Sequence, residues 1–69
     1  MRNHLTSIDF SQIDKHGEEA IGEIAKATHA KTYELTDKSV IFSSHSSHSA
    51  SRFRVALRDQ LNVYADQID

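Results

Sequence analysis

Residues 43–54, SSHSSHSASRFR, bring together serine, histidine and arginine side chains, which could bind a metal, act as nucleophile and base, or hold phosphate. His45 and His48 are three residues apart, a spacing compatible with zinc ligation by imidazole. A zinc site would need His29 or His16 as a further ligand, because no acid is near and the chain has no cysteine. We therefore expect no metal, with His45 and His48 solvated in a polar loop.

Serine and histidine in one segment also raise the question of nucleophilic catalysis. A serine nucleophile needs a base, a third group that orients the base, and an oxyanion site, usually in a sizeable pocket. The chain has 69 residues, little volume for such a pocket, and neither a nucleophile-elbow motif nor a glycine-rich loop. We expect neither an enzyme nor a cofactor.

Three arginines follow the histidines, in a window over residues 45–58 that contains no acid. On a helix that continues to residue 68, Arg52, Arg54 and Arg58 would lie in the first half, where the helix dipole disfavours cations. An anion bound at the start of the helix is one explanation. We favour pairing with acids of a first helix, because the net charge of −2 is not that of a basic domain. The candidate acids are Glu18, Glu19 and Glu23.

The pattern before this segment predicts a helix followed by a hairpin. Apolar residues at helical spacing predict a helix over residues 11–30, which an alternative breaks in two at Gly17. The alternation in KTYEL, the turn TDKS and the strand-forming VIFSS predict an antiparallel β-hairpin over residues 31–44. The side chains expected on the buried face of the hairpin are Tyr33, Leu35, Val40 and Phe42.

A second apolar stripe predicts a last helix over residues 50–68. Its members are Ala50, Phe53, Leu57, Leu61, Tyr64 and Ile68. Residues 43–51 would form a Ser/His loop before this helix or supply a third short strand. Val55 and Val63 lie off the stripe, and we expect them to border an apolar contact with a partner. The predicted fold class is thus α+β, a hairpin packed against an N-terminal and a C-terminal helix in the order α-β-β-α.

The composition is typical of a soluble globular protein, with 38% hydrophobic and 26% charged residues, and we expect residues 1–69 to form a single domain. No apolar run approaches the roughly 20 residues that cross a membrane. The first ten residues lack the apolar stretch of a secretion signal, so we expect a cytoplasmic location. Without cysteine, packing must stabilise the core, with dimerisation as an alternative.

The layout of the chain, with EEAIGEIAKATHA leading into TYELTDKSVIF and then into an amphipathic C-terminal helix, resembles that of small phage- and plasmid-encoded accessory proteins such as anti-CRISPR proteins. The resemblance lies in size and element order over about the whole chain. It implies a protein that occupies a surface on a nuclease complex or holds its subunits. It assigns no site residue.

These patterns predict a non-enzymatic interaction module that binds and modulates a larger protein or ribonucleoprotein complex, in the manner of a phage-type inhibitor of host defence. The residues expected to form the partner surface are His45, His48, Arg52, Arg54, Arg58, Val55 and Val63. The alternative function is a small nucleic-acid-binding or regulatory protein in which the three arginines contact phosphates. A homodimer stays open as a further partner, and no membrane contact is expected.

Overall fold

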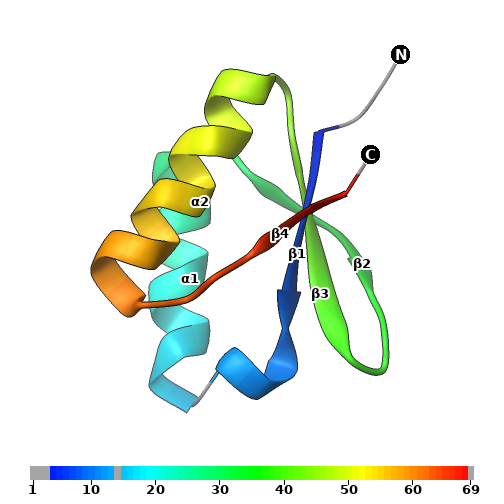
Figure 1. Cartoon of the computed structure of the whole chain (residues 1–69), viewed down its shortest axis with the longest axis vertical. Helices are drawn as coiled ribbons and strands as arrows, with labels where there is room; N and C mark the ends of the chain where they lie inside the picture. Colours follow the sequence, from blue (N-terminus) through cyan, green and yellow to red (C-terminus); the bar gives the residue numbers. More distant parts are fainter. Residues whose placement is uncertain (1–3, 14, 69) are drawn as a thin grey trace.

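The computed structural model describes residues 4–13 and 15–68. The elements are β1 (His4–Asp9), the short 3-10 helix η1 (Phe10–Gln12), α1 (Lys15–Ala27), β2 (Lys31–Leu35), β3 (Ser39–Ser44), α2 (Ser47–Leu61) and β4 (Asp66–Ile68). The strands form one antiparallel sheet in the order β2-β3-β1-β4, and both helices cover the same face of it (Figure 1). This β-α-β-β-α-β order is the split β-α-β, or ferredoxin-like, arrangement.

The predicted fold class is correct in being α+β with an antiparallel hairpin and two helices, but the predicted order α-β-β-α is wrong. Two of the strands are not predicted: β1 precedes the first predicted helix, and β4 lies within residues 50–68, for which the sequence pattern predicts a helix. β1 lacks the alternation of a half-buried strand, because the polar Thr6 is fully buried beside Ile8 while Leu5 lies on the opposite face. Pairing with strands on both sides, rather than its own hydrophobic pattern, makes this segment a strand.

The last helix ends at Leu61 and does not run to residue 68. Asn62 takes the left-handed conformation, with φ of 57°, and its backbone N–H closes the final turn. Asparagine tolerates this conformation better than most residues, so it is a common helix terminator. The chain then returns to the sheet as β4, where Ile68 lies opposite Leu5. Tyr64 and Ile68 therefore leave the helix, although their spacing fits the stripe.

The first helix occupies less of the chain than residues 11–30. The segment before it forms η1, which Asp9 caps by accepting a hydrogen bond from the backbone N–H of Ser11 (2.9 Å). α1 is one continuous helix, so the alternative with a break at Gly17 is wrong.

The predicted Ser/His loop over residues 43–51 is mostly regular structure. β3 and α2 take up most of it, and His45 and Ser46 connect the two elements. Ser46 caps α2, because its side-chain oxygen accepts a hydrogen bond from the backbone N–H of Ser49 (3.1 Å). The two histidines of this segment thus lie on a short, capped connection and on the first turn of a helix.

The core lies between the two helices and the covered face of the sheet. Its largest fully buried apolar side chains are Phe53, Ile8 and Leu57. The rings of Phe42 and Phe53 meet edge to face, with their centroids 5.1 Å apart. Val40 and Phe42 are buried, as the hairpin pattern predicts.

The edge strand β2 departs from the predicted burial. Tyr33 and Leu35 are 54% and 69% exposed, so the prediction that they face the core is wrong. β2 pairs with β3 alone among the described strands, and its register shifts between Thr32 and Glu34, which leaves Tyr33 in a bulge. Leu35 pairs with the buried Val40, but the helices leave it uncovered.

Candidate functional site

The residues of the predicted partner surface do not form one patch, because α2 presents them on different sides. His48, Arg52 and Val55 line a groove between α2 and α1. Arg54 and Arg58 lie on the other side of α2 and border a pocket beside the connection to β4. The polar surface expected along this helix is therefore divided between two adjoining regions, and Ser51 and Val55 border both of them.

Val63 is 4% exposed and belongs to the core cluster, so its side chain offers a partner little surface. The reason is the helix end at Leu61, after which the chain turns and carries Val63 inward. Val55 is 42% exposed and stays on the surface of α2.

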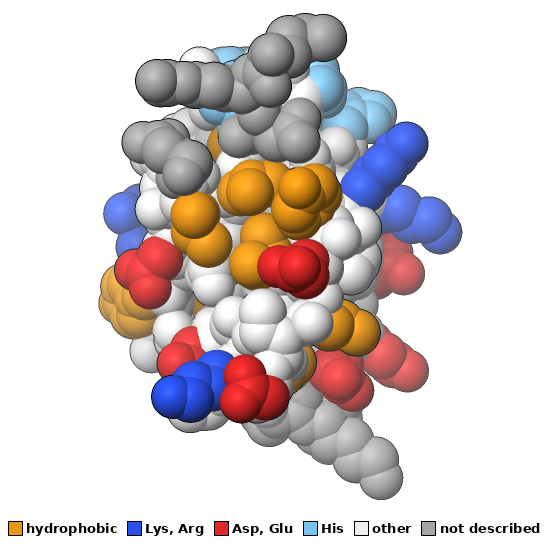
Figure 2. Space-filling view, turned by 90° about the vertical axis from the view of Figure 1, so that its right-hand side faces the viewer, with side chains coloured by type: hydrophobic (Ala, Val, Ile, Leu, Met, Phe, Trp, Pro, Cys, Tyr) orange, Lys and Arg blue, Asp and Glu red, His pale blue; other side chains and the backbone are white. Residues whose placement is uncertain are grey.

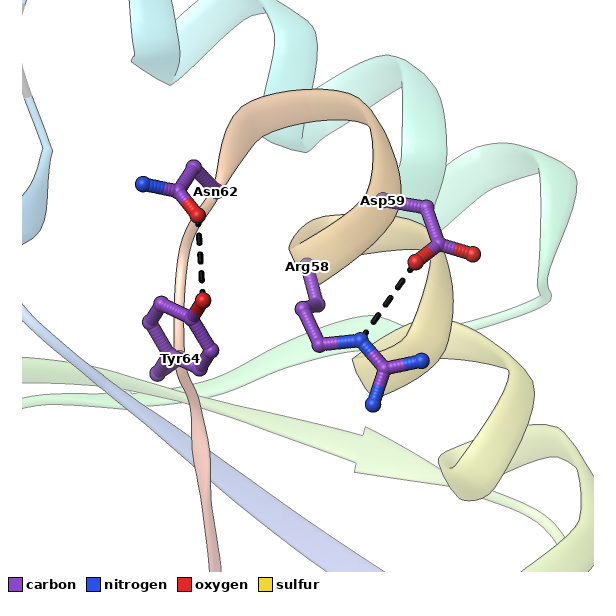
Figure 3. Close-up of polar contacts among 4 residues, drawn as sticks. All are labelled: Arg58, Asp59, Asn62 and Tyr64. Carbon is purple, nitrogen blue, oxygen red and sulfur yellow. Dashed lines mark hydrogen bonds and ion pairs between the residues drawn. The ribbon is translucent and has the colours of Figure 1, made fainter.

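The arginines do not form the expected ion pairs with the first helix in the described part of the chain. The one arginine with an acidic partner there is Arg58, whose Nε lies 3.4 Å from Oδ1 of its neighbour Asp59 (Figure 3). Both side chains are more than half exposed, so this pair contributes little stability. Arg58 also lies in the last turn of the shorter helix, where the helix dipole favours a cation. An anion at the helix start is no longer needed to explain this residue.

His45 lies next to His29. The two rings meet edge to face with centroids 6.1 Å apart. The hydroxyl of Ser49 lies 3.5 Å from Nε2 of His45, but no carboxylate within the described ranges hydrogen-bonds this imidazole to orient it as a catalytic base. No three or more histidine, cysteine, aspartate or glutamate residues among those described are placed to hold a metal ion.

A shallow pocket lies beside these histidines, where β2 begins. Its lining includes His29, Lys31, Tyr33 and His45, and no acid among the described residues borders it. The pocket adjoins β2, whose five residues are all exposed. The alternation in KTYEL predicts a strand, but it does not indicate that the two helices leave this strand uncovered.

The sheet face opposite the helices is partly apolar, and Figure 2 shows hydrophobic side chains gathered in its middle with charged side chains around them. Leu5 and Ile68 are cross-strand neighbours there, and Ile41 is buried although it lies outside the core cluster. Ser7 and Ser43 share this face with them. Sheets that bind RNA in this arrangement stack bases on aromatic rings of the central strands. None of these five sheet positions carries an aromatic ring.

None of the helices in the described ranges is long and apolar enough to cross a membrane. The split β-α-β arrangement is itself compatible with many functions, so the fold does not assign one. No family model matches the chain, and comparison with curated proteins and with solved structures finds no significant similarity.

Proposed function

We propose that this protein is a non-enzymatic interaction module that binds a larger protein or ribonucleoprotein complex through the free edge of β2. One observation carries the proposal: Tyr33 and Leu35 are 54% and 69% exposed on an edge strand. An extended segment of a partner that pairs with β2 would satisfy its outer backbone groups and cover both side chains. Such an edge otherwise leaves a protein open to aggregation.

Two features of β2 limit indiscriminate pairing. Lys31 places a charge at the start of the strand, and the register shift between Thr32 and Glu34 interrupts the regular ladder. Charged side chains and bulges are common ways in which proteins protect exposed sheet edges. These features favour a partner segment of matched sequence over pairing between two copies of β2.

The surroundings of β2 indicate the chemistry of the partner segment. His29, Lys31 and His45 border the pocket at the start of the strand, and no acid among the described residues lies in it. The other end of the strand carries the exposed Leu35. We therefore infer a segment with an acidic residue toward the start of β2 and an apolar residue beside Leu35.

Occupation of a surface on a larger complex is also the mode of action that the resemblance to anti-CRISPR proteins implies. We extend the proposal to modulation of the bound complex on this basis. The alternative, nucleic-acid binding by three arginines, receives less support, because Arg52 lies on a different side of α2 from Arg54 and Arg58.

Selection of peptides from a random display library against the purified protein tests this proposal. We expect the enriched peptides to combine an acidic residue with an apolar one, and to slow hydrogen exchange of backbone amides in β2. Leu35→Asp should weaken binding of a selected peptide at least about tenfold, because it replaces apolar contact worth about 1–2 kcal/mol with a charge. Val55→Asp is the matched control on α2, and it should leave the affinity unchanged.

The opposite pattern would contradict the proposal. If the enriched peptides tolerate Leu35→Asp but lose binding with Val55→Asp, the groove between the helices is the recognition surface. If no peptide is enriched, or if bound peptides leave exchange in β2 unchanged, strand addition is not how this protein recognises a partner.

A further inference from the structure

A small pocket between α2 and the connection to β4 is bordered by two arginines. From the helix it is bordered by Ser51, Arg54, Val55 and Arg58, and from the connection by Val63, Tyr64 and Ala65. No acid among the described residues lines it. Its volume of about 230 Å³ suits one compact group and is too small for a whole nucleotide.

Arg54 is the residue whose environment calls for a ligand. Nη1 of its guanidinium is buried and makes no hydrogen bond to any described residue. The Arg54 side chain as a whole is only half-buried, but a buried polar atom without a hydrogen-bond partner costs free energy. An anion in the adjoining pocket would pair with this guanidinium.

Arg58 adds a second guanidinium one turn further along the same side of α2. Two like charges at this spacing repel each other, so an anion shared between Arg54 and Arg58 would relieve the repulsion. The contact of Arg58 with Asp59 is long, at 3.4 Å, and exposed, so Arg58 can exchange it for another partner (Figure 3).

The opposite wall of the pocket is fixed by hydrogen bonds. The side-chain amide of Gln12 donates to the carbonyl oxygen of Tyr64 (2.8 Å) and accepts from its backbone N–H (2.7 Å). The hydroxyl of Tyr64 donates to Oδ1 of Asn62 (3.1 Å; Figure 3). Asp66, the next acid along the chain, pairs with Ser7 and so shares the sheet face away from the helices. These hydrogen bonds hold one wall of the pocket in place without a ligand, and the first acid after Tyr64 lies on the other face of the sheet.

We propose that this pocket binds a phosphate group between Arg54 and Arg58, with the hydroxyl of Ser51 at its rim. Guanidinium groups offer paired donors that match phosphate oxygens, and two of them match the double charge of a phosphate better than the single charge of a carboxylate. Phosphate binding here is independent of partner binding at β2, because β2 and β4 lie at opposite edges of the sheet.

Titration of the isotopically labelled protein with inorganic phosphate, followed by NMR at constant ionic strength near neutral pH, tests the site. We expect saturable shifts of the backbone amides of Ser51, Tyr64 and Ala65. Arg54→Gln should weaken binding about tenfold or more, because it removes a charge-assisted contact. Arg52→Gln makes the same change of charge on the other side of α2, and it should leave the affinity within about twofold, because this exposed charge does not border the pocket and is screened by solvent.

Two further variants keep the test decisive if Arg54→Gln disturbs folding. Arg58→Gln alters an exposed side chain, and it should also weaken phosphate binding. Asp59→Asn frees Arg58 from its acidic neighbour, and it should tighten binding about twofold. An unchanged spectrum away from the pocket shows that each variant is folded.

Three results would overturn the proposal: no saturable shift at these amides, an equal loss in Arg52→Gln and Arg54→Gln, or acetate binding as tightly as phosphate. The source of the phosphate is distinguished with O-phosphoserine. If this ester binds as tightly as inorganic phosphate, the site accepts a phosphorylated group; if the ester fails and inorganic phosphate binds, the ligand is free phosphate.

Discussion

Replacing two valines by alanine, one at a time, tests where α2 ends and what lies in the core. Val63 is 4% exposed, so Val63→Ala deletes two buried carbon atoms, worth about 0.8 kcal/mol each, and leaves a cavity. We expect a loss of about 2 kcal/mol in the free energy of unfolding. Val55 is 42% exposed on a helix, where alanine has the better helix propensity. The smaller loss of burial is then nearly offset, so Val55→Ala should cost less than about 0.5 kcal/mol.

Urea denaturation followed by circular dichroism measures the free energy of unfolding of each variant, and thermal denaturation gives its Tm. In a domain of this size 1 kcal/mol corresponds to about 4–8 °C in Tm, so Val63→Ala should lower Tm by about 8–16 °C and Val55→Ala by a few degrees at most. A helix over residues 50–68 would give the two valines similar surroundings. Equal losses in the two variants, or a larger loss in Val55→Ala, would therefore refute the helix end at Leu61 and the burial of Val63.

Two further predictions concern residues 9–12, at the end of β1 and in η1. Gln12→Ala removes both hydrogen bonds to the backbone of Tyr64 and should lower the free energy of unfolding by about 1–2 kcal/mol in urea denaturation; Gln12→Glu keeps the acceptor alone and should lose about half as much. Hydrogen bonds from the backbone and side chain of Ser11 hold the pKa of Asp9 below its ordinary value of 3.8. Because the pKa is lower in the folded state, this stabilisation is present above pH 3.8 and is lost as the pH falls through the folded pKa, so Asp9→Asn should flatten the acid limb of the stability curve.

The hairpin and the buried stripe of α2 could be predicted from the sequence because both rest on local patterns. VIFSS places Val40 and Phe42 on one face of a strand, and Ala50, Phe53 and Leu57 recur at the helical period. In these segments the hydrophobic pattern and the observed burial agree.

The two added strands could not be predicted in this way, since their pattern is set by partners far along the chain. β1 has a buried threonine, Thr6, where alternation would place an apolar residue. Tyr64 in the connection and Ile68 in β4 continue the spacing of the helical stripe, so periodicity alone extends the helix. Asn62 was the available sign of a helix end, but asparagine is also found inside helices.

The candidate sites likewise combine features that a local sequence pattern predicts with features that only the tertiary structure determines. The helical period of 3.6 residues separates Arg52 from Arg54 and Arg58, and this division could have been read from the sequence once the helix was placed. The contact between His29 and His45 depends on where the first helix ends relative to β3, which no local pattern encodes. The exposure of β2 depends on how far the helices extend over the sheet, and that is also a tertiary property.

The position of β1 has a consequence for how the molecule assembles. This strand lies in the interior of the sheet, between β3 and β4, although it comes first among the described elements. Its hydrogen bonds must wait until the second half of the chain is in place, so we expect folding to be slower than in a bundle of similar length built from neighbouring segments. A version shortened by residues 4–9 would not merely have a narrower sheet: it would separate β4 from the hairpin altogether.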